Sequence, residues 1–229
     1  MKREIVQTSD GSTTIYLPDW NESYHSKHGA IQEAYHVFIN NGLYFATNEI
    51  VGLASKAESI SILEIGFGTG LNSFITFLEA EKSGIKIDYV GVEAYPVLLE
   101  EALQMNYPQE IEPSKRAIFQ QMHECGWEQK NAMAANFTLT KQKKLFQELV
   151  DQSVYDLIYF DAFGFRVQPE LWSEALFQSM YAALKEKGIL VTYACRTSIK
   201  NAMLTAGFSV EKLPGAPGKR EMLRATKGF

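Results

Sequence analysis

The chain has 229 residues, of which 46% are hydrophobic and 21% charged, and its formal net charge at pH 7 is -5. These values indicate a globular protein and exclude wholesale disorder; the negative charge excludes a general affinity for nucleic acid, so an RNA partner must meet a local basic patch. No apolar run is long enough for a membrane span and the amino terminus has no signal-peptide pattern, so we expect a cytoplasmic protein.

Cysteine and histidine usage gives no sign of a metal centre or a disulfide. The two cysteines, Cys125 and Cys195, lie far apart without metal-ligand spacing. His25, His28 and His36 have no carboxylate or cysteine partner at a useful spacing, so we interpret them as packing or surface residues. We expect no bound metal.

The amino-terminal part predicts a small extension ahead of the main sheet. The β-rich run Thr13–Leu17 is stopped by Pro18 and indicates a strand of a hairpin. From Ala30 the apolar residues recur at helical spacing, and Gly42 is the expected end of that helix. A second helical stretch is expected over about 42–56.

An apolar run that ends in a glycine-rich turn organises the rest of the chain. Residues 60–65 predict a buried parallel strand, and the glycines that follow let the backbone turn sharply before a helix near Leu71. A dinucleotide site needs glycine or alanine where Leu71 stands. The spacing of Gly66, Gly68 and Gly70 instead resembles motif I of the class I methyltransferases that bind S-adenosylmethionine, although by itself it also fits a plain strand-to-helix connection.

Two further strands end in acidic side chains. Ile87–Glu93 predicts a second strand, and Glu93 at its carboxyl end is placed to accept hydrogen bonds from ribose hydroxyls. Val154–Phe160 predicts a fourth core strand that runs directly into Asp161, whose alternative role is a helix or turn cap. Because ligands of open α/β sheets bind at the carboxyl ends of the strands, we expect the glycine turn, Glu93 and Asp161 to converge.

The remaining elements alternate between helix and strand. Pro96 is expected to begin a helix, and Pro169 another that ends at Gly188. Residues 107–135 show no clear pattern.

This alternation predicts the α/β fold class, with a doubly wound, mostly parallel sheet of the class I methyltransferase (Rossmann-like) type. Segments 208–213 and 221–225 predict an antiparallel carboxyl-terminal hairpin. We divide the chain into an amino-terminal extension of hairpin and helices, 1–56, packed on a methyltransferase domain, 57–229.

The loop after the fourth strand carries motifs of one family. Asp161–Phe163 with Pro169–Trp172 resembles the D-G/A-F … N-P-E/D-M/L-W loop of the MnmC-type tRNA methyltransferase domain, called MnmD when it stands alone. The resemblance extends to Tyr24–Ser26, similar to Y-F-S; to Gly66–Asn72, which matches G-F-G-T-G-L-N; and to Gly218–Leu223, similar to G-x-K-R-E-M-L.

The resemblance implies methyl transfer from S-adenosylmethionine to the exocyclic amine of 5-aminomethyl-2-thiouridine at the tRNA wobble position. It implies Asp161 as the catalytic residue; with a reference pKa of about 4 the carboxylate is expected to orient the amine and stabilise its developing charge rather than deprotonate it. The implied cofactor contacts are Glu64, Gly66, Phe67, Gly68, Thr69, Gly70, Asn72, Glu93 and Asp161. The implied substrate contacts are Tyr24, Ser26, Phe163, Phe165, Pro169, Trp172, Lys219 and Arg220.

Two of these assignments have plain structural alternatives. Phe163 and Phe165 either stack on the extruded uracil or pack the loop against the domain. Lys219 and Arg220 either grip anticodon phosphates or belong to a solvated charged face that also includes Lys212, Arg224 and Lys227.

The sequence departs from the family at several points. Gly164–Phe165 stands where Ala-Pro is common, Gln168 replaces an asparagine, and Thr140–Lys143 provides no adenine-contacting aspartate. Longer family members carry a flavin-dependent oxidoreductase domain, so we expect this chain to perform the methylation alone, as a monomer that binds the anticodon region of tRNA and no membrane.

Other functions stay open. The same sheet suits a methyltransferase for another amine, an aminopropyl transferase or a non-catalytic RNA-binding module. A nicotinamide dehydrogenase is disfavoured by Leu71.

Overall fold

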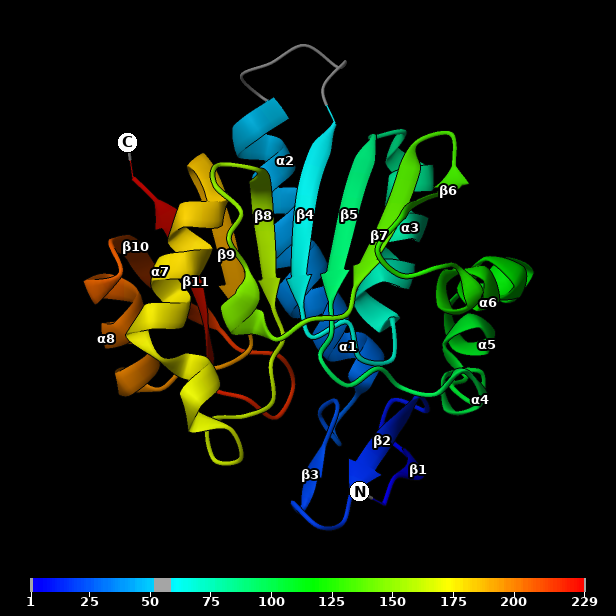
Figure 1. Cartoon of the computed structure of the whole chain (residues 1–229). Coiled ribbons are helices and arrows are strands. Elements are labelled where there is room, and N and C mark those ends of the chain that lie inside the picture. The colour runs from blue at the N-terminus through cyan, green and yellow to red at the C-terminus, as the bar shows by residue number, and fades with distance from the viewer. Residues whose placement is uncertain (1, 52–58, 229) are drawn as a thin grey trace.

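An eight-stranded sheet runs through the centre of the computed structural model, which describes residues 2–51 and 59–228 (Figure 1). The strand order is β10-β11-β9-β8-β4-β5-β7-β6. The strands are β4 (Ile60–Ile65), β5 (Ile87–Val92), β6 (Lys130–Ala134), β7 (Phe137–Gln142), β8 (Tyr155–Phe160), β9 (Leu184–Thr192), β10 (Phe208–Pro214) and β11 (Glu221–Lys227). The five strands from β9 to β7 in that order are parallel to one another, whereas β11, β10 and β6 are antiparallel to their neighbours. The expected fold, a mostly parallel sheet with an antiparallel carboxyl-terminal hairpin, is confirmed.

Helices cover both faces of this sheet. One face carries α1 (Ala30–Ala34), the π-helical η1 (Tyr35–Leu43), α2 (Tyr44–Val51) and α3 (Leu71–Ser83), and the other carries α7 (Glu174–Ala183) and α8 (Thr197–Thr205) (Figure 1). The helices α4 (Leu99–Ala102), α5 (Tyr107–Ile111) and α6 (Arg116–Glu124) and the short 3₁₀ turns η2 (Pro113–Lys115), η3 (Phe146–Glu148) and η4 (Pro169–Trp172) complete this layer arrangement. Two hydrophobic cores result, one on each side of the sheet.

The first helix does not end at Gly42. The elements α1, η1 and α2 follow one another without a break, and Gly42 lies inside them. A Cβ at Gly42 would lie 3.0 Å from Cγ2 of Val191 and 3.2 Å from Cε1 of Tyr159. The glycine therefore allows the helix to approach the sheet closely rather than capping it. The expected helix end at 56 and the boundary between 56 and 57 lie outside the described residues, so the division into domains stays a prediction.

Two other helix predictions were also wrong in detail. The helix expected from Pro96 begins only at Leu99. The helix expected from Pro169 is interrupted at Ser173, whose extended backbone separates η4 from α7 and whose hydroxyl caps α7. It ends at Ala183, and Gly188 lies within β9.

The amino-terminal strand prediction is confirmed, and the element is larger than a hairpin. Strands β1 (Glu4–Gln7), β2 (Thr13–Leu17) and β3 (Glu22–Ser23) form a three-stranded antiparallel sheet. Figure 1 shows this sheet beyond the carboxyl ends of β4, β5 and β8. Ile15 and Leu17 of β2 belong to the same hydrophobic core as η1 and α3, which fixes the small sheet over that edge.

Candidate active site

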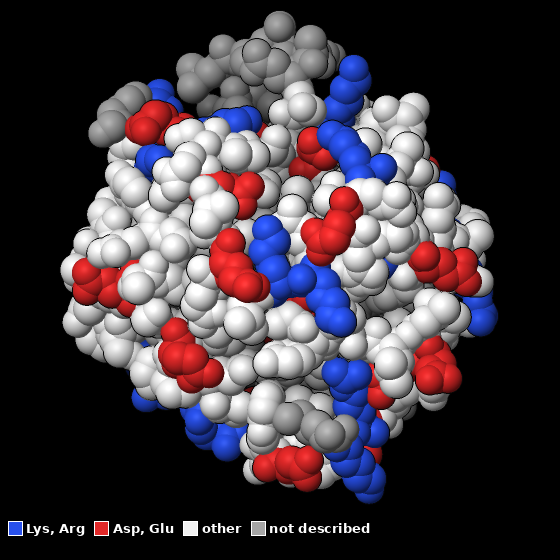
Figure 2. Space-filling view, in the orientation of Figure 1, with Lys and Arg blue, Asp and Glu red and all other residues white. Residues whose placement is uncertain are grey.

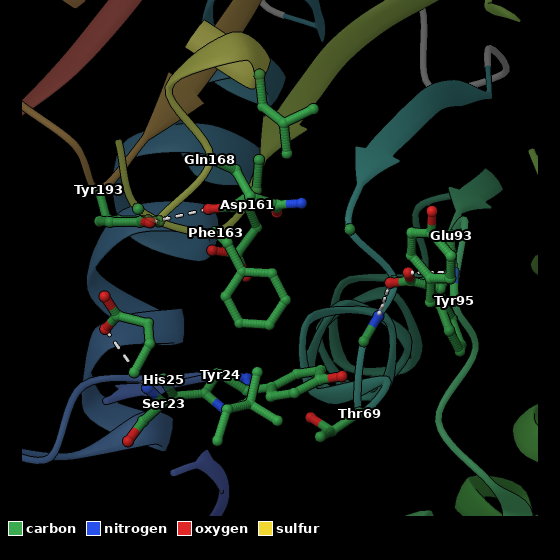
Figure 3. Close-up of a pocket in the computed structure, with 18 of the residues that line it drawn as sticks. Ser23, Tyr24, His25, Thr69, Glu93, Tyr95, Asp161, Phe163, Gln168 and Tyr193 are labelled. Carbon is green, nitrogen blue, oxygen red and sulfur yellow. Dashed lines mark hydrogen bonds between the residues drawn. The ribbon is translucent and has the colours of Figure 1, made fainter. Parts of the chain in front are cut away.

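A cavity of about 1180 Å³ lies at the carboxyl ends of the parallel strands, beside the amino-terminal sheet. It is lined by Gly66 and Gly68 after β4, by Glu93 after β5 and by Asp161 after β8. In Figure 3, Glu93 and Tyr95 lie on one side of this cavity, and Asp161, Phe163 and Tyr193 on the other. The structure thus brings together the three strand ends that the sequence predicts to converge.

The glycine turn packs directly against the strand that carries Asp161. Gly66 has a φ of 91°, and a Cβ there would lie 2.6 Å from the carbonyl oxygen of Asp161. Only glycine fits both the left-handed backbone and this close approach. Phe67 packs behind the turn, where a Cβ at Gly91 would lie 2.5 Å from its Cδ2. Gly70, with a φ of 73°, starts α3 and lies outside the cavity lining.

Glu93 is fixed by backbone donors. Its carboxylate accepts hydrogen bonds from the N–H of Gly68 at 3.1 Å and of Tyr95 at 2.9 Å. Burial raises the pKa of Glu93, and these hydrogen bonds oppose that rise. The side chain therefore connects the glycine turn to the end of β5 in one defined position, facing the cavity.

An asparagine on α3 connects the buried carboxyl group of Glu64 to the half-buried carboxyl group of Asp161. Asn72 donates through Nδ2 to Oε1 of Glu64 and to Oδ2 of Asp161, both at 2.9 Å. Burial and then the charge of Asp161 hold the pKa of Glu64 well above its ordinary value. The other amide atom, Asn72 Oδ1, is buried and accepts no hydrogen bond from the residues that the structure describes.

The pKa of Asp161 differs from the sequence expectation. Burial, and after it the negative charge of Glu33, raises the pKa of Asp161 to about 7, while the hydrogen bond from Asn72 and the charge of Lys219 act in the opposite direction. The assumption of a reference value near 4 was therefore wrong. At neutral pH this carboxyl group exchanges between its charged and neutral forms, which makes it a suitable proton acceptor.

The backbone of the loop that begins at Asp161 is held at three successive residues. The N–H of Asp161 donates to Ile65 at 2.9 Å, the Tyr193 hydroxyl donates to the carbonyl of Ala162 at 2.8 Å, and Nε1 of Trp172 donates to the carbonyl of Phe163 at 2.8 Å. The buried Trp172 therefore supports the loop from outside the cavity lining. Pro169 does not line the cavity either.

Only one of the two predicted stacking rings reaches the cavity. Phe163 lines it and meets Trp20 and Tyr24 edge-on, with ring centroids 5.6 Å and 4.9 Å away. Phe165 is outside the lining and lies under the guanidinium of Arg196, 4.6 Å from the ring centroid. Tyr24 and Ser26 both line the cavity, as predicted.

The loop is also connected to the amino-terminal sheet by one arginine. Nη2 of Arg166 donates to the carbonyl oxygens of Trp20 at 3.1 Å and Asn21 at 2.9 Å, and to Oε2 of Glu22 at 3.1 Å. Trp20 and Glu22 line the cavity with Phe163. Arg166 thus connects the two segments that form this side of the cavity.

The basic residues near the carboxyl end do not act as one surface. Lys219 lines the cavity, pairs with the buried Glu33 and lies over the Tyr193 ring, 3.9 Å from its centroid. Arg220 is exposed and outside the lining. The other three cations pair with carboxylates: Lys212 with Glu221, Arg224 with Glu211 and Lys227 with Glu186.

Several residues of the cavity were missed by the sequence analysis. The wall beside Glu93 includes Tyr95 and Leu98 after β5, and Leu145, Phe146 and Gln147, which come shortly after the segment Thr140–Lys143 that provides no adenine-contacting aspartate. Trp20 and Glu33 come from the amino-terminal part. No local motif marks Trp20, whereas Glu33 begins the segment 33–38, which is similar to the family's E-x-x-Y-V-F but was not assigned to the site. Tyr193 follows β9 directly, so the rule that ligands gather at carboxyl strand ends could have found it.

Residues 2–51 and 59–228 contain neither a group of side chains suited to a metal ion nor a membrane-spanning helix. No group of three or more histidine, cysteine or acidic side chains in this part of the chain could hold a metal ion. Within the same residues, no helix is long and apolar enough to cross a membrane.

Comparisons with known proteins identify a family and its relatives. A family described as "S-adenosyl-L-methionine-dependent methyltransferase" matches residues 105–228. The chain is 29% identical, over 98% of its length, to the tRNA 5-methylaminomethyl-2-thiouridine biosynthesis bifunctional protein MnmC of Delftia acidovorans, and 27% identical, over 91%, to that of Ralstonia nicotianae. It covers only 35% and 32% of these two relatives, about a third of their length.

A solved structure has the same fold. The crystal structure of MNMC2 from Aquifex aeolicus matches with a TM-score of 0.77 and 24% sequence identity, covering 100% of this chain and 72% of that protein.

Proposed function

Because this chain belongs to the family of S-adenosyl-L-methionine-dependent methyltransferases, we propose that it methylates the exocyclic amine of 5-aminomethyl-2-thiouridine at the wobble position of tRNA. One observation carries the proposal: a single cavity has a glycine turn with Glu93 on one side and Asp161 with aromatic rings on the other. The names of the MnmC relatives, which refer to tRNA 5-methylaminomethyl-2-thiouridine biosynthesis, support the substrate. The product is 5-methylaminomethyl-2-thiouridine.

We assign the first side of the cavity to the cofactor. Gly66 and Gly68 present backbone rather than side chains, and Glu93 is held where it can accept hydrogen bonds from ribose hydroxyls. The unpartnered acceptor Asn72 Oδ1 fits the ammonium group of a methionine moiety. When bound, S-adenosylmethionine supplies an electrophilic methyl carbon, whose bond to sulfur breaks with its electron pair on sulfur as a bond to nitrogen forms.

We assign the second side to the amine. Alkylation requires a neutral amine whose lone pair is aligned at about 3 to 3.5 Å from the methyl carbon, so the protein must fix the nitrogen and remove its proton. Asp161 is anchored through Asn72 and has a pKa of about 7, which suits it to orient the amine and to accept the proton. Before that proton is transferred, the charged form of Asp161 pairs with the ammonium form of the substrate.

The aromatic wall gives the nucleobase a place outside the RNA stack. Phe163, Tyr24 and Trp20 form an edge-to-face cluster on this side of the cavity. Enzymes that modify a single base must expose it, and aromatic rings offer an extruded base a stacking surface. The same rings exclude water from the amine beside Asp161.

Transfer of label from S-adenosylmethionine to a panel of amines tests this function. The panel consists of tRNA bearing 5-aminomethyl-2-thiouridine, the same tRNA with an unmodified wobble uridine, and a free polyamine. We expect label only in the first RNA, recovered in the wobble nucleoside after digestion. Label in the polyamine alone would assign the site to a different amine and contradict the proposal.

A further inference from the structure

A protein that acts on tRNA needs a surface for phosphates, and the carboxyl-terminal hairpin alone does not provide it. The chain has a net charge of -5, and basic and acidic side chains are interspersed over the face in Figure 2. On the hairpin itself, Lys212, Arg224 and Lys227 already pair with carboxylates. Cations that are neutralised in this way release few counterions on binding RNA.

Among the lysines and arginines that form no ion pair with another described residue, four come from segments that meet at one side of the cavity. They are Lys27 before α1, Arg196 and Lys200 at the start of α8, and Arg220 in the loop between β10 and β11. Lys27, Arg196 and Arg220 are exposed, and Lys200 is half-buried. We call these four residues the cationic arc.

Contacts between its segments connect the arc from end to end. Next to Lys27, the imidazole of His28 packs against Gly218, two residues before Arg220. At the other end, Sγ of Cys195 contacts Oε2 of Glu221 at 3.5 Å, which brings the residue before Arg196 to the residue after Arg220. The positive charge of Lys200 acts on the same Cys195 thiol. Three segments distant in sequence therefore place the four cations along one edge.

The arc borders the substrate side of the cavity. Lys27 itself lines the cavity, and Lys219, adjacent to Arg220, does so too. The guanidinium of Arg196 lies over the ring of Phe165, two residues after the cavity residue Phe163, and makes no hydrogen bond to the described residues. A planar guanidinium held on an aromatic ring keeps its donors available for phosphate oxygens.

We propose that the cationic arc binds backbone phosphates of the tRNA anticodon arm and so presents the wobble nucleotide to the cavity. This inference rests on the proposed function, since it takes tRNA as the substrate. Contacts with phosphates position an RNA without reading its sequence, so the arc provides register while the cavity selects the modified base. Glu221, which pairs with Lys212 at 3.0 Å, is the carboxylate that interrupts the arc.

The test compares tRNA binding at several salt concentrations for the whole chain and three variants. Arg196→Ala with Arg220→Ala removes two arc cations. Lys86→Ala with Arg116→Ala is the matched control, because both residues are exposed, make no ion pair with a described residue, and lie away from the cavity, Lys86 directly before β5. Arg196→Lys with Arg220→Lys restores the charge. Binding of S-adenosylmethionine by each variant reports the integrity of the fold.

We expect the alanine pair to lower the slope of log affinity against log salt by about 2 and to weaken tRNA binding about tenfold, since each lost phosphate contact lowers the slope by about 1. The control pair and the lysine pair should keep the wild-type slope. An unchanged slope in the arc variant, a lowered slope in the control, or no tRNA binding by the wild type would overturn the proposal.

The two proposals fail separately. If the wild type methylates tRNA but the arc variant keeps the wild-type salt slope, the proposed function stands and the proposal about the arc is contradicted. If the wild type binds tRNA through the arc but transfers no label, the proposal about the arc stands and the proposed function is contradicted.

Discussion

The two sides of the cavity are built by different means. On the side of the glycine turn, the backbone N–H groups of Gly66 and Phe67 donate to the carbonyl of Val92 at 3.0 Å and 3.1 Å, and Glu93 closes the link. On the side of Asp161, the loop is held through side chains of Tyr193, Trp172 and Arg166. The first side is therefore part of the sheet, whereas the second depends on single side chains from distant segments.

Substitution of Gly66 should disrupt the side of the cavity that is part of the sheet, and we expect it to have the largest effect on cofactor binding. Gly66→Ala places a Cβ 2.6 Å from the Asp161 carbonyl at a φ of 91°, so we expect a loss of about 3 kcal/mol of unfolding free energy or more, and loss of measurable cofactor binding. Chemical denaturation and calorimetry measure both.

A second glycine with similar backbone strain provides the control. Gly84 has a φ of 72° but no neighbour within 4 Å of an added Cβ, so Gly84→Ala should cost about 1 kcal/mol and leave cofactor binding intact. Equal effects of the two substitutions would show that backbone strain alone, and not the contact with Asp161, matters at the turn.

Removal of the Arg166 side chain should affect only the side of the cavity that carries Asp161. Without Arg166 the loop loses its bonds to Trp20, Asn21 and Glu22, so Arg166→Ala should raise KM for tRNA about tenfold and leave cofactor affinity unchanged. Arg166→Lys should behave like the alanine variant, because an ammonium does not reproduce the guanidinium geometry. Steady-state kinetics with each substrate varied in turn measures this.

Lys130→Ala is the matched control for that experiment. Lys130 is 57% exposed and pairs with Asp88, much as Arg166 is 59% exposed and pairs with Glu22, but it lies outside the cavity lining. A comparable rise in KM for Lys130→Ala would assign the effect to general loss of charge.

Two charges beside Asp161 should move its titration in opposite directions. The carboxylate of Glu33 raises the pKa of Asp161 and Lys219 lowers it. The acidic limb of kcat/KM should therefore move to lower pH in Glu33→Gln and to higher pH in Lys219→Met, changing the rate at neutral pH several-fold. Movement of both variants in one direction would mean that another group controls the limb.

A further effect is expected on the pH dependence of stability. Folding raises the pKa of Asp161 from 3.8 to about 7, so the folded protein binds the proton more tightly than the unfolded chain does. The stability contribution is complete below about pH 4 and is lost as the pH rises through 7. The difference in unfolding free energy between the wild type and Asp161→Asn should therefore decrease as the pH rises from about 4 to about 7. A difference that stays constant with pH would argue against the raised pKa.

The same contrast explains what the sequence could predict. Strands that end in Gly66, Glu93 and Asp161 are recognisable locally, because a buried parallel strand is a continuous apolar run and its carboxyl end is a ligand position. The pKa of Asp161 was not predictable in this way, since it depends on burial and on Glu33, far away in the sequence.

The ion pairs of the basic residues near the carboxyl end could not be predicted from the sequence either. The spacing of Lys212, Arg224 and Lys227 indicates a basic face, yet each finds a carboxylate only once β9, β10 and β11 are paired in the sheet. Gly42 has the sequence context of a helix cap, but close packing against Val191 and Tyr159 keeps it inside a helix. Tertiary contacts override local signals at these positions.

The central claim, that one side of the cavity binds the cofactor and the other carries out the chemistry, is tested most directly by measuring cofactor affinity and saturated turnover in Glu93→Ala and Asp161→Asn. We predict that Glu93→Ala weakens cofactor binding about 10- to 100-fold, the value of a charge-assisted hydrogen bond, and that Asp161→Asn lowers turnover about 100-fold with affinity nearly unchanged. Loss of cofactor affinity in Asp161→Asn as large as in Glu93→Ala, with turnover retained at saturation, would contradict the account.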